Sequence, residues 1–379
     1  MSLPIWTRRR LLSAGFGGLS LTTLAACGGG GGGSGNPPAP APPDYRPVAQ
    51  PFPLSLHSAV ALDARSVAVV GGSRGQPSFS ASVDLFDTEA QQWRMGASLS
   101  TGRSQSQVLA LDAQRLFVHG GARSLSGSRT AEWVDLGRGT SQPALASPSR
   151  LAHTATRLRD GRLLVAGGSS SEGYFGGVSP TLELWDPQTG QWRFAARPLQ
   201  QPRQGHSATL LGDGRVLFVG GFTGTGMAAS AELWDPATET SQLFSDPALG
   251  RAGHAAQLLP SGDLLLAGGE TGATPQAPNP GVLLLRREPW RVEALAPALP
   301  SLAAASAITP GGALLLFGGV DPSGQAVAAA LQAGPGVRAL PPLPSPREWL
   351  SATALPSGRV LLLGGENRGA LATSGLLFG

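Results

Sequence analysis

Lysine is absent from this sequence, and cysteine, tyrosine and histidine are scarce. All 28 basic residues are arginine, and the 379 residues include one Cys, two Tyr and five His. Without lysine, the chain cannot form a lysine Schiff base or bind phosphate through a Walker-type loop. Because Cys27 is the only cysteine, no disulfide can form within the chain.

Clustered positive charge is also missing. The 28 basic residues face 24 acidic ones, which gives a formal net charge of +4. The arginines are spread along the chain, apart from three in a row at residues 8–10. Dispersed charge of this kind is typical of a solvated surface, so we expect no nucleic acid among the partners.

The first 44 residues have the pattern of an export signal followed by a linker. Residues 7–12 contain three consecutive arginines, and the apolar stretch from residue 11 ends at residue 26. Together the two segments are similar to a twin-arginine signal. The sequence Leu-Ala-Ala-Cys at 24–27 resembles a bacterial lipobox, which implies cleavage before Cys27 and a lipid on its sulfur. Two or three acyl chains anchor a protein stably. Residues 28–44 are rich in Gly and then in Pro, which predicts a flexible tether that becomes semi-extended.

We therefore expect residues 1–27 to be a lipoprotein signal peptide. The mature domain would be exported and anchored to the bacterial cell envelope, facing the periplasm or lying on the cell surface. A secreted chain with a chance cysteine is the alternative.

A repeat of about 50 residues covers the rest of the chain. Its mark is a pair of glycines that closes a hydrophobic run, at intervals of 46 to 53 residues. The seven pairs are Gly71-Gly72, Gly120-Gly121, Gly167-Gly168, Gly220-Gly221, Gly268-Gly269, Gly318-Gly319 and Gly364-Gly365. Self-similarity at this period indicates a repeat architecture such as a propeller.

Each unit has the pattern of four short strands. In the fourth unit, apolar runs at 206–211 and 215–219 flank Gly212-Asp213-Gly214, and Asp-Gly between apolar runs predicts a hairpin. A third strand follows at 231–236, and Trp192 opens the fourth strand of the third unit. Four antiparallel strands per unit form a propeller blade. We therefore predict an all-β, seven-bladed propeller over residues 45–379.

The last unit is incomplete, because the chain after Gly365 has room for one further strand, near residues 371–378. We predict that residues 45–53 supply the missing outer strand. The N- and C-terminal strands would then pair and close the ring, which removes exposed sheet edges.

The paired glycines, the Asp-Pro-x-Thr run at 186–189 and the Trp six residues after that Asp resemble a Kelch motif. The Leu-x-Asp-Gly-Arg-Val-Leu run at 211–217 is similar to the galactose oxidase/Kelch superfamily. The resemblance covers the whole predicted domain and weakens in the sixth unit, which lacks the Trp and the Asp-Pro. A galactose oxidase copper site needs a Cys linked to a Tyr and a second Tyr, but the tyrosines are Tyr45 and Tyr174 and Cys27 lies in the signal. The resemblance thus implies the fold without the copper chemistry, and we expect no metal and no cofactor.

Arginine and histidine recur at fixed distances before the glycine pairs. A His lies 14 residues before the first Gly in four units, and an Arg lies 17 residues before it in five. The histidines are His57, His153, His206 and His254; the arginines are Arg103, Arg150, Arg203, Arg251 and Arg347. In the family architecture these positions open the innermost strands, near the channel mouth. Such a ring would hold the blades together through backbone carbonyls, or it would bind an anion, a carbohydrate or a metal.

The connections after the glycine pairs vary most in length, and recognition residues concentrate on such loops. The longest contain Glu172 and Tyr174 (residues 169–180) and Glu270 (residues 270–281), and Glu366 follows the last pair. Trp349 lies beside the channel-mouth position of the last unit and matches no position of the repeat. Its side chain would stack on a sugar or pack in the core.

Two functions remain open. The first is a binding platform for an unidentified protein or glycan, monomeric and without catalytic residues. The alternative is a carbohydrate-active enzyme such as a sugar epimerase or mutarotase, in which Glu172, Glu270 or Glu366 would form an acid/base pair with a channel histidine.

Overall fold

The structure, a computed structural model, describes residues 44–379 with the exception of 76–78, 123–130, 145–149, 170–176, 272–280, 296–304, 322 and 335–336. The predicted signal peptide with Cys27, and residues 28–43 of the predicted tether, lie outside the described residues. The described residues form strands β1 to β29 and one short 3-10 helix, η1 (Pro247–Leu249).

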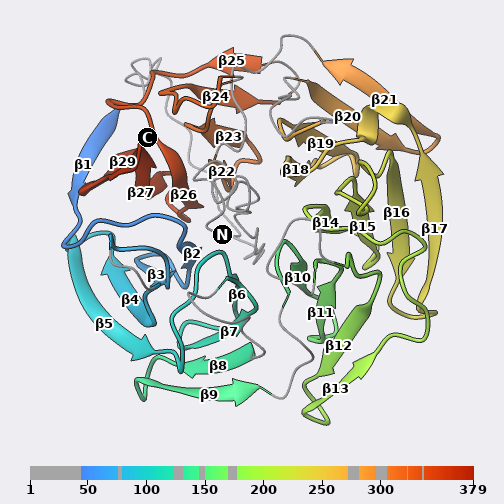
Figure 1. Cartoon of the computed structure of the whole chain (residues 1–379), viewed down its shortest axis with the longest axis horizontal. Helices are drawn as coiled ribbons and strands as arrows, with labels where there is room; N and C mark the ends of the chain where they lie inside the picture. Colours follow the sequence, from blue (N-terminus) through green and yellow to red (C-terminus); the bar gives the residue numbers. More distant parts are fainter. Residues whose placement is uncertain are drawn as a thin grey trace, which may run out of the picture.

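Seven antiparallel sheets surround a central axis, which confirms the predicted seven-bladed propeller (Figure 1). Blades 1 to 6 each take four consecutive strands, ordered from the axis outward. Blade 1 contains β2 (Ser58–Ala61), β3 (Ser66–Val70), β4 (Ser82–Asp87) and β5 (Gln92–Ser98). Blade 2 contains β6 (Gln107–Ala110), β7 (Arg115–His119), β8 (Ala131–Asp135) and β9 (Thr140–Ala144). Blade 3 contains β10 (Thr154–Arg157), β11 (Leu163–Ala166), β12 (Leu182–Asp186) and β13 (Gln191–Phe194).

The second half of the ring repeats this order. Blade 4 contains β14 (Ser207–Leu210), β15 (Val216–Val219), β16 (Ser230–Asp235) and β17 (Thr240–Ser245). Blade 5 contains β18 (Ala255–Leu258), β19 (Leu264–Ala267), β20 (Val282–Arg287) and β21 (Trp290–Leu295). Blade 6 contains β22 (Ala305–Ile308), β23 (Leu314–Phe317), β24 (Ala330–Ala333) and β25 (Val337–Ala339).

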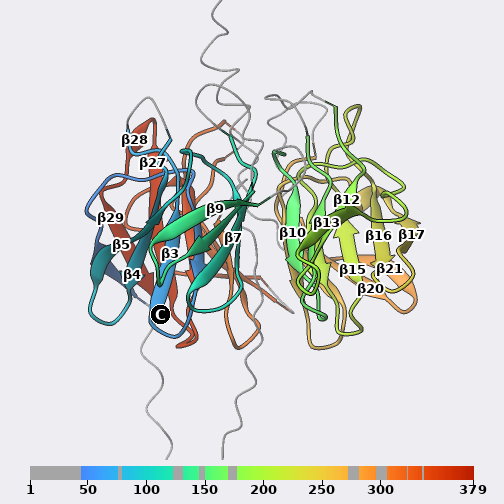
Figure 2. The ribbon, with the colours of Figure 1, turned by 90° about the horizontal axis from the view of Figure 1, so that it is seen from below.

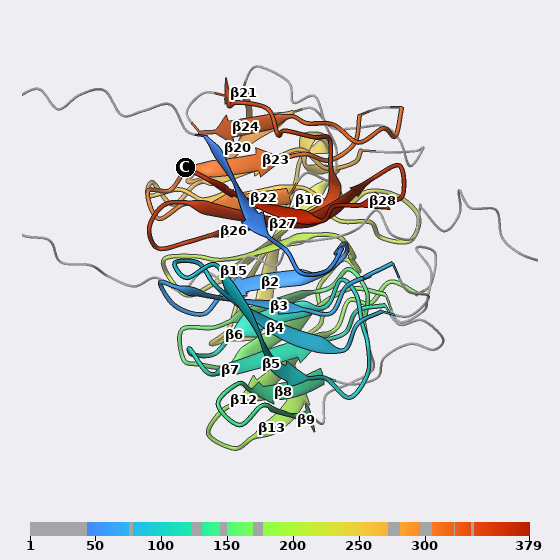
Figure 3. The same ribbon diagram turned by 90° about the vertical axis from the view of Figure 1, so that its left-hand side faces the viewer.

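Blade 7 joins the two ends of the described chain. Its strands are β26 (Glu348–Ala354), β27 (Val360–Asn367), β29 (Ser374–Phe378) and β1 (Tyr45–Ala49), with the two-residue β28 (Ala370–Leu371) beside β27. Strand β1 pairs antiparallel with β29, from Tyr45 opposite Phe378 to Ala49 opposite Ser374. Figure 3 shows the blue β1 against the red C-terminal strands. The predicted closure is confirmed, with both terminal strands shorter than the predicted 45–53 and 371–378.

The strand connections gather at two ends of the ring (Figure 2). We call the end with the connections after the glycine pairs the loop face, and the end with the hairpins between first and second strands the turn face. Connections at the loop face run to 10–15 residues in blades 1 to 6, whereas the turn-face hairpins have four or five. The chain enters β1 at the turn face, where the Gly379 N–H donates to the carbonyl of Asp44 at 3.3 Å.

The core lies between the blades. The described residues form seven buried hydrophobic clusters, one for each interface between neighbouring blades, which we call seams. Strand β15 shows why, because Val216 and Phe218 pack into seam 3/4 while Leu217 and Val219 pack into seam 4/5. Successive side chains of a strand point to opposite faces, so a continuous apolar run fills two seams. Each such side chain contributes about 1.5–3 kcal/mol by burial.

The glycine pairs allow the blades to approach each other closely. Gly220 and Gly221 have φ of 63° and 95°, in the left-handed region that glycine adopts without strain. The Gly221 N–H donates to the carbonyl of Arg251 in the next blade at 2.7 Å, and a Cβ on Gly220 would lie 2.3 Å from that oxygen. At the closing seam, Gly365 N–H donates to the carbonyl of Leu54 in the same way, at 2.7 Å. A side chain at these positions would separate the blades.

Candidate functional site

The five predicted arginines lie in the seams with their guanidinium groups directed into the protein. Arg203 is fully buried, and its Nη1 donates to the carbonyl of Gly220 at 2.7 Å. Its Nη2 donates to Oε2 of Glu232, on β16, at 3.2 Å. Arg103 pairs with Glu132 and Arg150 with Glu183 in the same way. The third strands of blades 2 to 4 therefore supply a buried carboxylate for each guanidinium.

The carboxylates have further partners. Glu232 Oε1 accepts from the backbone N–H of Gln200 at 2.6 Å and from the hydroxyl of Ser241 at 2.7 Å. The backbone N–H of Ser100 donates to Glu132 Oε2 at 2.8 Å. These bonds satisfy the buried charges, which would otherwise be costly.

Blades 5 and 7 hold their arginines without an acid on the third strand. Arg251 Nη1 donates to the carbonyls of Gly268 and Gly281 at 3.1 and 2.9 Å. Arg347 Nη1 donates to the carbonyl of Ser374 at 2.7 Å. The register places Leu283 and Leu376 where blades 2 to 4 have glutamate. Burial lowers the pKa of Arg251 to about 10, so the guanidinium stays charged at neutral pH.

Blade 1 replaces the missing arginine with one from its loop. Arg74 follows the first glycine pair and reaches Asp84, which occupies the register position of the glutamates in blades 2 to 4. Its guanidinium carbon also lies 3.6 Å from the centroid of the Phe52 ring. A cation over an aromatic face adds electrostatic attraction to the ion pair.

Three of the predicted histidines reach the innermost strand of the preceding blade. Nε2 of His206 lies 3.0 Å from the hydroxyl of Thr154, and Nε2 of His254 lies 2.9 Å from that of Ser207. Across the closing seam, Nε2 of His57 lies 2.7 Å from the hydroxyl of Ser351. The ring of His206 also covers Gly167, where a Cβ would lie 2.7 Å from Cε1. Each histidine thus connects two blades next to a glycine pair.

The fourth, His153, meets another histidine. Its Nε2 lies 2.8 Å from Nδ1 of His119, the last residue of β7, and both side chains are 1% exposed. Burial in the first place, and the Arg150 guanidinium in the second, lower the pKa of His153 to about 3. The same two causes act on His254 with Arg251. All these imidazoles are neutral at pH 7.

These contacts favour the structural interpretation of the arginine and histidine ring. The histidine rings contact hydroxyls or an imidazole of the preceding blade, whereas the guanidinium groups bond to carbonyls and carboxylates of their own blade. Within the described part of the chain, no group of three or more His, Cys, Asp or Glu side chains is arranged to hold a metal. Binding of an anion or a carbohydrate by the ring stays a hypothesis.

Trp349 belongs to a ring of left-handed residues at the loop-face ends of the innermost strands. In the six blades where this position is described, φ is positive one residue before the histidine position: 57° at Leu56, 54° at Gln105, 51° at Ala152, 69° at Gly205 and Gly253, and 59° at Trp349. The Leu56 N–H donates to the carbonyl of Trp349 at 3.3 Å, and the Gly253 N–H to that of Gly205 at 2.9 Å. The expectation that Trp349 matches no repeat position was therefore wrong, because the rule is one of backbone conformation. The side chain is half-buried.

Two of the predicted carboxylates occupy one repeat position at the loop face. Glu270 and Glu366 each follow a glycine pair directly. Glu270 is 7% exposed, and its carboxylate bonds to none of the residues that the structure describes; burial raises its pKa to about 7. Glu366 lies opposite Glu348 in the pairing of β26 and β27. Glu172 and Tyr174 lie outside the described residues.

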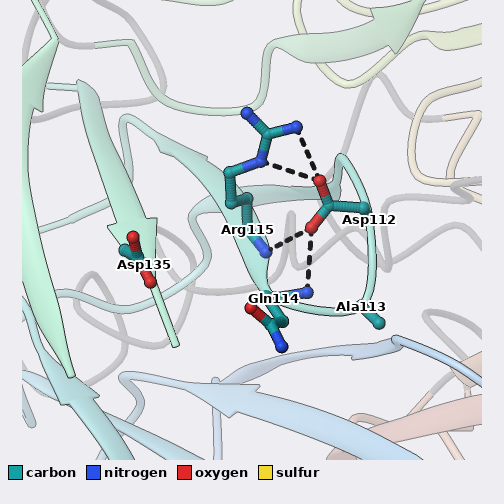
Figure 4. A pocket seen from close by; sticks show the side chains of 5 residues that line it. All are labelled: Asp112, Ala113, Gln114, Arg115 and Asp135. Carbon is teal, nitrogen blue, oxygen red and sulfur yellow. Dashed lines mark hydrogen bonds and ion pairs between the residues drawn. The ribbon is translucent and has the colours of Figure 1, made fainter. Parts of the chain in front are cut away.

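One open hollow lies at the turn face. Asp112, Ala113, Gln114, Arg115 and Asp135 line it (Figure 4). Asp112 accepts from the backbone N–H groups of Gln114 and Arg115 at 2.9 Å and from Arg115 Nε at 2.7 Å. Asp135 accepts from the backbone N–H of Arg138 at 2.9 Å, so the carboxylates of the hollow cap their own hairpins.

Sequence reasoning did not identify the partners of the ring. They are the carboxylates Glu132, Glu183 and Glu232, the hydroxyls of Thr154, Ser207 and Ser351, and His119. A signal was present, because a Glu is the second or third residue of the third strand in each of units 2 to 4, where an Arg also occurs.

No family model matches the chain. Adagio-like protein 3 of Oryza sativa subsp. japonica is 32% identical over 208 residues, which is 48% of this chain and 32% of that protein. Kelch-like protein 33 of Homo sapiens is 33% identical over 108 residues, 28% of this chain and 19% of that protein. The chain spans a third or less of the length of these curated relatives.

Among solved structures, a fungal alcohol oxidase in complex with copper superimposes with a TM-score of 0.67 at 16% identity, covering 89% of this chain and 76% of the oxidase. Identity at that level shows a common fold and nothing of the chemistry. Within the described ranges, no helix has the length and apolar character needed to cross a membrane.

Proposed function

Since the chain is a seven-bladed β-propeller of the Kelch type, we propose that it is a binding platform of the cell envelope whose loop face engages a protein or a glycan. The observation that carries the proposal is the contrast between the two faces. The connections after the glycine pairs are long and unequal in length, whereas the turn face has uniform short hairpins. Recognition is concentrated on variable loops held by a rigid frame.

The position of the N-terminal strand supports this orientation. Residue 44 lies at the turn face, beside the C-terminal Gly379. A tether from a lipidated Cys27 would therefore join the domain at the turn face and leave the loop face directed away from the membrane. Replacing Cys27 with Ser should move the protein from the membrane fraction to the soluble fraction, and retention of the variant in the membrane would contradict lipid anchoring.

The binding test uses residues 44–379 as a soluble domain. A glycan array and capture from envelope extracts would identify ligands, and each ligand would be tested against Trp349→Ala and Glu366→Ala. We expect these loop-face changes to weaken binding at least tenfold. The matched control, Glu89→Ala and Arg138→Ala on exposed turn-face positions, should bind as the parent does. Equal losses in both pairs would contradict a loop-face site.

A second candidate, a carbohydrate-active enzyme, is favoured by one observation. Glu270 is a buried carboxylic acid at the loop face, and burial raises its pKa to about 7. A general acid works best when its pKa lies near the working pH. If the domain accelerates the interconversion of sugar anomers, the Glu270→Gln variant should lose that activity at least a hundredfold. Absence of turnover by the parent across a panel of sugars would leave the platform as the function.

A further inference from the structure

All five histidines of the chain lie inside the ring, in four of its seven seams. His57 occupies seam 7/1, His119 and His153 occupy seam 2/3, His206 occupies seam 3/4 and His254 occupies seam 4/5. Each side chain is at least nine-tenths buried. Seams 1/2, 5/6 and 6/7 contain no histidine. Titratable imidazole is therefore confined to one arc of the ring and its closing seam.

The sites are built for neutral imidazole. In His57, His206 and His254, Nε2 meets a hydroxyl while the buried Nδ1 has no hydrogen-bond partner. In the His119–His153 pair one nitrogen of each ring bonds to the other ring, and the remaining two have no partner. A second proton on any of these rings would place a charge inside a buried seam, which is unfavourable.

The charged groups that face the histidines oppose protonation. Every histidine faces a guanidinium, and four also face another imidazole. The facing groups are Arg74 for His57; His153, Arg150 and Arg103 for His119; His119, His206 and Arg150 for His153; Arg203, His153 and His254 for His206; and Arg251 and His206 for His254. The backbone carbonyls of Arg150 and Arg203 offset the effect partly at His153 and His206.

We propose that the five histidines form an acid-operated latch, which opens the propeller first along the seams that contain them. In neutral solution they hold neighbouring blades together at the loop-face end of the channel. On acidification each ring gains charge only if it leaves its seam for water. The same seams carry the hydroxyl and imidazole contacts that hold the blades, so protonation and separation of the blades are coupled.

The sign of the effect follows from proton linkage. Burial holds the pKa of His57, His153 and His254 at about 3, against an ordinary value of 6.5, and holds that of His119 and His206 well below it. The open state therefore binds more protons, so the stability that these histidines contribute is complete above pH 6.5 and declines as the pH falls toward 3. Glu270 acts in the opposite direction with one proton, because its pKa is raised from 4.5 to about 7. The net uptake on opening near pH 5 is roughly four protons.

The first experiment needs no substitution. Hydrogen–deuterium exchange at the imidazole C2 position, followed by mass spectrometry of residues 44–379, gives the titration of every histidine in the folded domain. We expect all five to stay neutral down to the pH at which the ring opens, and then to titrate together with the opening. Histidines that titrate near pH 6.5 while the fold is intact would overturn the proposal.

The second experiment compares variants. His206→Gln with His254→Gln keeps a hydrogen-bonding group toward Thr154 and Ser207 but cannot be protonated. We expect its acid midpoint to fall by roughly half a pH unit, with about two fewer protons taken up on opening. The matched control is Ser106→Ala, the same repeat position in the histidine-free seam 1/2, which should leave the acid midpoint unchanged. An acid midpoint and proton uptake equal to those of the parent would contradict the latch.

The third experiment tests where opening begins. The domain from residue 44 has no cysteine, so single cysteines report on chosen seams: Ala256→Cys in seam 4/5 and Ala307→Cys in seam 6/7. Reaction with dithiodipyridine, which proceeds in acid, should begin at a higher pH for Ala256→Cys than for Ala307→Cys. Equal onset at both seams would overturn opening along the histidine seams.

Discussion

Blades 2 to 4 and blades 5 and 7 hold the same arginine position by different means. In blades 2 to 4 each guanidinium meets a buried glutamate, whereas Arg251 and Arg347 meet carbonyls and a leucine occupies the glutamate position. One contact is common to both groups. Every one of these arginines donates to the carbonyl of the first glycine of its own pair, 17 residues later.

The difference separates what the position requires from what it tolerates. The glycine carbonyl is directed into the seam because the glycine pair docks against the next blade, and it needs a buried donor. Arginine supplies that donor in blades 2 to 5 and 7, and the acid is an addition that compensates the charge in three of these blades. The histidines also depend on a partner that varies between blades. Thr154, Ser207 and Ser351, whose hydroxyls contact the histidines, each lie in the blade before one that carries a His.

The largest effect expected from this comparison follows loss of one partner of a buried ion pair. Glu232→Ala would leave the guanidinium of Arg203 buried and uncompensated, and we expect a loss of about 3–5 kcal/mol in the free energy of unfolding. Urea unfolding of residues 44–379 measures it. The double variant Arg203→Met with Glu232→Leu should lose less than the sum of the two single variants, because no charge remains buried. Additive losses would contradict the pairing.

A smaller loss is expected where the arginine has no acid. Arg251→Met removes hydrogen bonds to two carbonyls and also removes a buried charge, so the two contributions partly offset each other. We expect a loss of about 1–3 kcal/mol, the cost of leaving buried acceptors unsatisfied. A loss in urea as large as that of Glu232→Ala would show that the acid has no special part in the first group.

Transferring the acid to blade 5 should have a still smaller effect. Leu283→Glu places a carboxylate at the register position of Glu232, near Arg251, in place of a buried leucine. Since a buried ion pair and a hydrophobic side chain of similar size stabilise to a similar extent, we expect a change within about 1 kcal/mol at pH 7. The control is Leu217→Glu, because the repeat provides no arginine to pair with a glutamate at this position. We expect this variant to be strongly destabilised.

The sequence predicted those features that depend on local chemistry. Paired glycines recur with the period of the blades, Asp-Gly marks the hairpin in two of them, and the unfilled edge of the last blade predicts a role for residues 45–53, of which 45–49 form the strand. The partners of the ring were not predicted. Glu132 and Glu232 lie 29 residues after their arginines and Glu183 lies 33 after its own, and the histidine partners belong to the preceding blade. Which residues share a seam is a property of the closed ring, and no local pattern contains it.

The left-handed ring at the loop-face ends of the innermost strands gives the last and smallest effect. Leucine, glutamine, alanine, glycine and tryptophan occupy this position, so only the backbone reveals it. Ala152 has φ of 51° where blades 4 and 5 have Gly205 and Gly253, and a left-handed conformation costs a residue with a Cβ about 1–2 kcal/mol. Glycine avoids that cost but loses more entropy on folding, by about 0.5–1 kcal/mol. We therefore expect Ala152→Gly to stabilise the domain by about 0.5–1 kcal/mol in urea, whereas Ala155→Gly in the adjoining strand β10 should destabilise it. A loss at both positions would mean that the left-handed conformation at residue 152 carries no strain.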